Sequence, residues 1–96
     1  MRPSVALAKH REAVRELVRR RRATNPRVFG SVARGEDQEN SDIDILVDAL
    51  PGATLLDLGG LQVQLEDLLG VKVDLATPEE LHRRIRAKVL AEATPI

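Results

Sequence analysis

Two aspartates placed two residues apart, Asp42 and Asp44, are the residues of this chain best suited to chemistry. In an extended strand, residues i and i+2 point to the same face, so both carboxylates would project together while Ile43 and Ile45 enter the core. Hard oxygen ligands in that arrangement suit Mg²⁺ bound to substrate phosphates. In the alternative interpretation, Asp42 is a turn residue after Ser41 and Asp44 simply faces water, although aspartate is disfavoured in strands.

A Gly-Ser turn precedes this pair and has the features of a phosphate site. Gly30 would let a ligand approach the backbone closely, and the amides that follow Ser31 would lie at the start of a helical turn, where an anion is favoured. Ser31 can add a hydroxyl donor. Arg34 is the cation that could stabilise phosphate charge, unless it pairs with Glu36 or Asp37 on the surface. Gly-Ser alone is more typical of a loop, and it is the spacing to the two aspartates that favours the phosphate interpretation.

The rest of the pattern predicts the elements that would position these residues. Periodic apolar residues predict three helices, and a threonine stands before each of the two later ones. The pair Asn25-Pro26 is expected to stop the first helix, and Gly70 is expected to end the second. The predicted helices are Ser4–Arg22, a segment from Thr54 to Gly70, and one that starts from the capping box Thr77–Glu80 and runs toward Leu90. The predicted strands are Arg27–Phe29, Ile43–Val47 and Val71–Leu75, with a single helical turn between Ser31, as its N-cap, and Gly35.

This order of elements predicts an α/β fold with a small mixed sheet of about three strands covered by helices. Only about a dozen residues separate the first two strands, so these are expected to be antiparallel neighbours. A crossover helix joins the second strand to the third, which implies a parallel pair. On the third strand, alternation places Asp74 on the face opposite Val71, Val73 and Leu75.

The window from Gly30 to Asp44 resembles the signature of the polymerase-beta-like nucleotidyltransferase superfamily: Gly-Ser, ten residues, then Asp-x-Asp. Within it, Gly-Ser-Val-Ala-Arg-Gly (30–35) and Ser-Asp-Ile-Asp-Ile (41–45) make the chain most similar to the minimal nucleotidyltransferases, the small partners of HEPN-type toxins. The resemblance covers residues 26–76 directly and the flanking helices by length and order.

The resemblance implies a fold, a reaction and a role for each motif residue. It implies the polymerase-beta-like nucleotidyltransferase fold, ATP as substrate and two Mg²⁺ ions. Asp42 and Asp44 would hold the triphosphate-bound ion and share the second. Asp74 would complete the second metal site and help deprotonate the attacking hydroxyl. The phosphates would be bound by Gly30, Ser31 and Arg34.

Composition narrows the classes of function. With 96 residues, the chain is expected to be one domain, 1–96, too small to add a recognition domain for an acceptor. Fifteen basic and fifteen acidic residues cancel and Phe29 is the only aromatic, so nucleic-acid binding is disfavoured. The chain has no cysteine and no long apolar run, which indicates a cytoplasmic protein without a membrane segment.

We therefore expect an enzyme that transfers AMP from ATP to a hydroxyl, implied by the resemblance to be a tyrosine of a HEPN-type toxin encoded by a neighbouring gene. The chain would then act as an antitoxin. The alternative is a non-catalytic antitoxin that neutralises the toxin by binding. Transfer to RNA or to a small molecule is disfavoured, and a homo-oligomer and a hetero-oligomer are both compatible with the sequence.

Three features stay open at this stage. The run Arg19–Arg22 at a helix end fits a solvated helix terminus or a contact with RNA or an acidic partner. Gly59-Gly60 inside a helix either permits close packing or marks a kink. Asp48 shares the strand parity of the other aspartates, and its position near the strand end indicates simple solvation.

Overall fold

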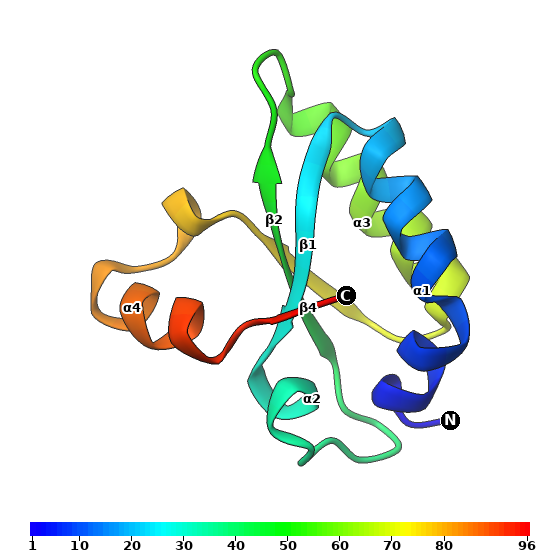
Figure 1. Ribbon diagram of the computed structural model, residues 1–96. Coiled ribbons are helices and arrows are strands. Elements are labelled where there is room, and N and C mark those ends of the chain that lie inside the picture. Colours follow the sequence, from blue (N-terminus) through cyan, green and yellow to red (C-terminus); the bar gives the residue numbers. More distant parts are fainter.

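The computed structural model describes residues 1–96 as a four-stranded sheet with helices around it (Figure 1). Helices α1 (Pro3–Arg20) and α3 (Leu55–Leu69) lie side by side on one face of the sheet, α4 (Arg83–Glu92) lies on the other side, and α2 (Gly30–Arg34) lies at one end. No helix is long and apolar enough to cross a membrane. The elements in chain order are α1 (Pro3–Arg20), β1 (Ala23–Phe29), α2 (Gly30–Arg34), β2 (Ile43–Ala49), α3 (Leu55–Leu69), β3 (Val73–Ala76), the 3₁₀ turn η1 (Pro78–Glu80), α4 (Arg83–Glu92) and β4 (Thr94–Pro95).

The sheet has the order β3-β2-β1-β4 and is mixed, as predicted. Strands β1 and β2 are antiparallel, with Phe29 opposite Asp44, and β2 and β3 are parallel, with Asp44 beside Asp74. The fourth strand, β4, was not predicted from the sequence. It is two residues long and contains Pro95, and neither length nor composition indicates a strand.

The core fills the space between the sheet and the α1–α3 pair. Alternate residues of β2 and β3 point into it because the strand period of two places them on one face; those of β2 and Val73 of β3 are fully buried, and Leu75 is partly buried. Helices α1 and α3 supply the opposing apolar side chains. The most deeply buried of these residues are Val14, Val18, Ile43, Ile45, Val47, Leu61, Leu65 and Val73.

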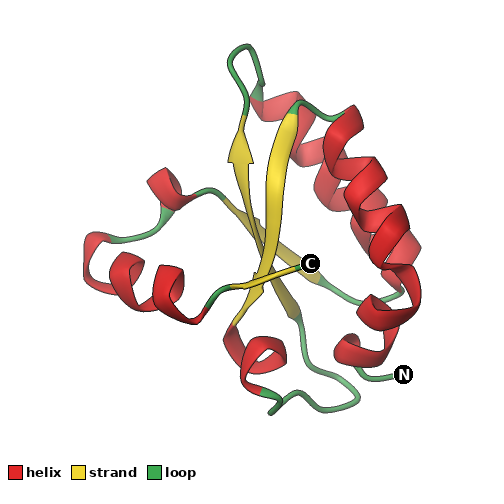
Figure 2. Ribbon diagram, in the orientation of Figure 1, coloured by secondary structure: helices red, strands yellow, loops and turns green.

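Local signals at the helix ends explain where the central elements start and stop. Thr54 caps α3 in a capping box with Asp57, and Gly70 ends that helix in the left-handed conformation. Gly35 ends α2 in the same way. These three predictions are confirmed. The loop of residues 35–42 then runs from α2 to β2 (Figure 2).

The prediction for Asn25-Pro26 was wrong. Helix α1 already ends at Arg20, and the pair lies inside β1, which is longer than expected. The register against β2 shifts between Thr24 and Arg27, and Asn25 has a φ of +54°. A bulge of this kind accommodates proline, which cannot donate a ladder hydrogen bond, without ending the strand.

Three boundaries also differ from expectation. Ser31 does not cap α2 but lies inside it, because the N-cap is Phe29, two residues earlier. Strand β3 begins at Val73 rather than at Val71. The capping box of Thr77 and Glu80 is present, but it starts only the turn η1, since the chain at Leu81 returns to an extended conformation before α4.

The arginine run and the glycine pair are related in the structure. The Arg19 and Arg20 side chains pair with Glu16 on the surface of α1. The Arg21 side chain instead crosses to α3, where its Nε donates to Gln64 Oε1 at 2.9 Å. A Cβ atom on Gly60 would lie 2.7 Å from Arg21 Nη1, so this glycine permits close packing.

Candidate active site

Gly30 and Asp44 are in direct contact, which joins the Gly-Ser turn to the aspartate pair. Phe29, at the end of β1, pairs with Asp44 of β2, so the next residue, Gly30, turns across the Asp44 side chain. A Cβ atom on Gly30 would lie 2.2 Å from Asp44 Oδ2, closer than any real contact. Gly30 also has a φ of +70°, which L side chains rarely adopt. Only glycine fits this position without displacing the carboxylate.

Three carboxylates gather on the sheet face that does not carry the core. Asp44 and Asp74 are neighbours on parallel strands and point to the same face, and Asp42 is exposed just before β2. Burial raises the pKa of Asp44 to about 6, with further contributions from the negative charges of Asp74 and then Asp42. The nearby Arg34 acts in the opposite direction. The predicted acidic residues therefore lie close enough to repel one another.

This donor set has the chemistry of a Mg²⁺ site, because all three groups supply hard carboxylate oxygens and their repulsion would be relieved by a cation. No group of three acidic or histidine side chains is arranged closely enough to hold a metal ion with the side chains as they stand. The carboxylates thus fit the ion in type and charge, while closure around it would require substrate oxygens and side-chain rotation.

The residues predicted to bind phosphate are Gly30, Ser31 and Arg34. Ser31 is half-buried in α2, and its hydroxyl makes no hydrogen bond within the chain. The Arg34 guanidinium pairs with Glu36 at 2.6 Å and with Glu92 at 3.2 Å. These two partners raise the pKa of Arg34, Glu36 more than Glu92. Pairing with Glu36 was one of the two surface alternatives for Arg34 considered from the sequence.

Two acidic residues, one at the site and one at the far end of β2, have contacts that sequence analysis missed. Glu92, the last residue of α4, accepts a hydrogen bond from the Gly30 backbone N–H at 2.8 Å, and no motif or spacing connects these two residues in the sequence. Asp48 is more than a solvated strand end. Its carboxylate accepts hydrogen bonds from Arg27 Nη2 at 2.8 Å and from Asn25 Nδ2 at 3.0 Å.

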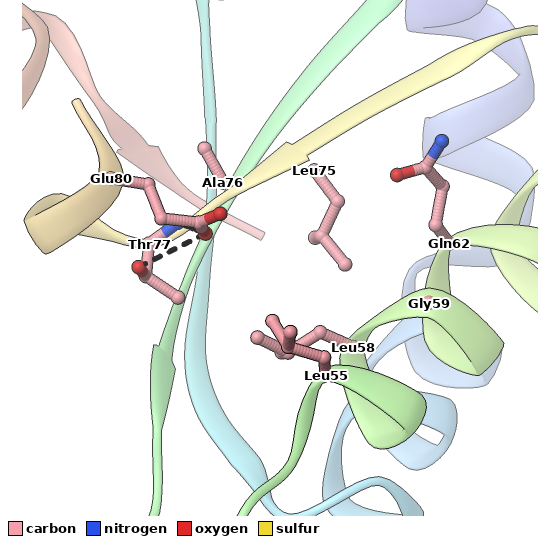
Figure 3. Close-up of a pocket in the computed structure, with 8 residues that line it drawn as sticks. All are labelled: Leu55, Leu58, Gly59, Gln62, Leu75, Ala76, Thr77 and Glu80. Atoms are coloured by element: carbon pink, nitrogen blue, oxygen red, sulfur yellow. Dashed lines mark hydrogen bonds between the residues drawn. The ribbon is translucent and has the colours of Figure 1, made fainter. Parts of the chain in front are cut away.

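A separate pocket of about 170 Å³ lies between the start of α3 and the end of β3 (Figure 3). Leu55, Leu58 and Leu75 contribute to its apolar lining. Leu75 follows Asp74 in the strand and so points to the opposite face. The pocket therefore belongs to the side of the sheet that α1 and α3 cover and is not the carboxylate site.

Comparison with known proteins agrees with this geometry. Residues 7–96 match the nucleotidyltransferase domain family, and the chain belongs to that family. The similarity extends to a subgroup: the chain is 48% identical over 65 residues to the protein adenylyltransferase MntA of Thermococcus cleftensis, covering 68% of this chain and 66% of the relative. It is 41% identical over 86 residues to a Methanocaldococcus jannaschii protein provisionally called protein adenylyltransferase MJ1217, covering 90% of this chain and 85% of the relative.

Solved structures lead to the same subgroup. One, provisionally described as a minimal nucleotidyltransferase, superimposes with a TM-score of 0.87 at 49% identity, covering 97% of this chain and 95% of the other. A toxin-antitoxin crystal structure with AMP-PNP superimposes with a TM-score of 0.71 at 26% identity, covering 83% of this chain and 66% of the other. The predicted fold and the predicted family are confirmed by these similarities.

Proposed function

We propose that this chain, as one domain of residues 1–96, transfers AMP from ATP to a hydroxyl of a partner protein. The observation that carries the proposal is the contact of Gly30 with Asp44, beside Asp74, which brings a phosphate-binding turn against a pair of carboxylates. The names of the relatives, protein adenylyltransferases, and the AMP-PNP bound to a similar toxin-antitoxin structure support adenylate as the transferred group.

In the proposed reaction, the acceptor hydroxyl oxygen forms a bond to the α-phosphorus of ATP. The bond from that phosphorus to the oxygen bridging to the β-phosphate breaks, and pyrophosphate leaves. Asp74 lies exposed beside Asp44 and would receive the hydroxyl proton. Arg34 and the Gly30 N–H would bind the phosphates that depart, with Ser31 as a further donor.

Magnesium fits this arrangement. Asp42, Asp44 and Asp74 would hold the two ions, which, when bound, supply neutralisation of the phosphate charge. The raised pKa of Asp44 is consistent with this role, because a carboxylate held among other negative charges gains most from a bound cation.

We further propose that the acceptor is a tyrosine of a HEPN-type toxin encoded by a neighbouring gene, in the cytoplasm, and that its modification neutralises it. The similarity to toxin-antitoxin complexes supports a toxin as partner. Asp74 is exposed beside Asp44 on the sheet face that does not carry the core. The acceptor would therefore dock over the exposed Asp74 side of the sheet.

The test is to co-express the chain with the adjacent HEPN-like protein, add ATP and Mg²⁺, and measure the partner's mass. The wild-type chain should add one or more AMP units, and Asp42→Asn should keep the complex but lose the transfer. Asp48→Asn is the matched control, since it changes an aspartate of the same strand face that lies at the far end and pairs with Arg27. It should retain transfer.

Each other outcome contradicts a specific part of the proposal. Full transfer by Asp42→Asn would remove that residue from the catalytic set. A complex that relieves toxicity without any added mass would favour neutralisation by binding. Failure of the two proteins to associate would reject the toxin as partner.

A further inference from the structure

The Glu92 carboxylate accepts hydrogen bonds from two of the groups proposed to bind phosphate, the Gly30 backbone N–H and the Arg34 guanidinium. Its Oε1 accepts from the Gly30 backbone N–H at 2.8 Å, and both oxygens lie 3.2 Å from Arg34 Nη1. A carboxylate held by one backbone amide and one guanidinium has the same contacts that a phosphate oxygen pair would make. Glu92 comes from the opposite end of the chain, so this contact is made by the tertiary fold and not by local sequence.

The backbone around Glu92 is fixed, so the placement of the carboxylate does not depend on a loose chain end. The buried Val89 anchors the last turn of α4, and Thr94 pairs with Val28 of β1, two residues before Gly30. Beyond it, the buried Ile96 donates its N–H to the Pro26 carbonyl at 3.0 Å. The side chain of Glu92 itself retains 20% exposure, which leaves it a path toward solvent.

We propose that Glu92 is an intramolecular competitor for the phosphate site, and that ATP binds by displacing its side chain from Gly30 and Arg34. This inference rests on the proposed nucleotide-binding function of the same site. A single backbone N–H donates one good hydrogen bond, so Gly30 cannot serve Glu92 and a phosphate together. The charge of Glu92 would also repel the triphosphate while the side chain remains docked.

Glu92 is well suited to this competition because it stays ionised. The Gly30 amide, followed by the charge and hydrogen bond of Arg34, holds the pKa of Glu92 below its usual range. The docked carboxylate keeps Arg34 oriented toward Gly30. It also sets a threshold, because a ligand must gain more free energy from the site than the docked Glu92 side chain does. A triphosphate that also engages the aspartate side can exceed this threshold, whereas a small anion that offers only one phosphate gains too little.

The test compares Glu92→Gln and Glu92→Ala with the wild-type chain by titration calorimetry, with ATP and, separately, inorganic tripolyphosphate as ligands in the presence of Mg²⁺. Removing a competitor raises apparent affinity by the inverse of the fraction of sites that were free, and a surface ion pair of this kind predicts about twofold to sixfold tighter binding. Both ligands should gain equally, because Glu92 competes with phosphate and not with adenine. Thermal unfolding checks that the variants fold.

Glu79→Gln is the control for net charge. It removes one carboxylate, as Glu92→Gln does, from an exposed side chain on η1 that makes no hydrogen bond. Its affinity for both ligands should equal that of the wild type.

The remaining outcomes separate two failures. If the wild type binds ATP and the folded Glu92 variants bind it equally or more weakly, Glu92 is not a competitor and this inference is rejected, while the proposed function stands. A gain for ATP alone also rejects it, since the effect would then not be at the phosphates. If neither the wild type nor any variant binds ATP or tripolyphosphate, the proposed nucleotide site itself is rejected.

Discussion

Replacing Asp44 by asparagine should stabilise the metal-free protein at neutral pH while abolishing transfer. The pKa of Asp44 rises from 3.8 in its ordinary state to about 6 in the fold, so ionising it costs folding free energy. A shift of roughly two units corresponds to about 3 kcal/mol at most. Because Asp44 is only half-buried, solvent screening reduces the expected gain to about 1 kcal/mol. In a domain of this size, that raises Tm by roughly 4–8 °C.

The raised pKa of Asp44 determines how the stability difference between the wild type and Asp44→Asn changes with pH. A carboxyl group with a raised folded-state pKa binds its proton more tightly in the folded state than in the unfolded state. Its contribution to stability is therefore greatest below pH 3.8, decreases between pH 3.8 and about 6, and is fully unfavourable above that range. Asparagine resembles the protonated carboxyl group, so Asp44→Asn should show its full advantage at pH 8 and almost none near pH 3.8.

Thermal unfolding of the wild type and Asp44→Asn without divalent ions, from pH 4 to pH 8, measures this difference. Asp48→Asn is the informative control. It lies on the same strand and face but pairs with the mostly buried Arg27, so its loss should cost about 1–2 kcal/mol at pH 8. A stability difference for Asp44→Asn that does not change with pH, or a loss of stability at pH 8, would refute the account in which burial and the neighbouring carboxylates raise the pKa of Asp44.

Three further predictions concern the ligands and the glycines. ATP with Mg²⁺ should raise Tm more than either alone, because a ligand stabilises by RT ln(1 + [L]/Kd) and the proposed ion is shared between protein and phosphate; equal shifts with and without Mg²⁺ would contradict this. Gly30→Ala should abolish ATP binding and lower Tm, since its Cβ would meet Asp44 Oδ2 at 2.2 Å; calorimetry and thermal unfolding check both effects. Gly59→Ala should stabilise α3 by up to about 1 kcal/mol, since its Cβ would meet no other atom. Gly60→Ala must displace the Arg21 guanidinium and should gain less stability. Equal gains of the two variants in chemical denaturation would contradict the packing of Arg21 on Gly60.

The parts of the fold that depend on local rules could be predicted from the sequence. The period of two along β2 and β3 placed Asp44 and Asp74 on the face opposite the buried residues, and the parallel pairing of those strands followed from the crossover helix. The cap at Thr54 and the helix end at Gly70 could also be predicted, because each is encoded within a few residues.

The parts that depend on tertiary contact could not be predicted. Glu92 reaches Gly30 only because β4 pairs with β1, and β4 is too short to leave a periodic signal. Arg21 was indistinguishable from its three arginine neighbours, since what separates it is a partner on α3. Asn25-Pro26 has the composition of a stop, and only the pairing of the strand on both sides of it shows that the chain continues.

Because of the bulge at Asn25-Pro26, the side chains of β1 that face the core are at odd-numbered positions before the bulge and at even-numbered positions after it. Counted straight along the strand, Ala23 would share a face with Arg27 and Phe29, yet Ala23 is buried in the core with Val28. The additional residue inverts the alternation once, so that both halves of the strand direct their apolar side chains inward. Regular pairing at the present length would slip the register by one residue and turn the apolar side chains of one half of β1 outward, whereas loss of one bulge residue would leave Ala23 and Val28 on the same inner face. This short stretch should therefore tolerate the loss of one residue, which removes the bulge, far better than the gain of one.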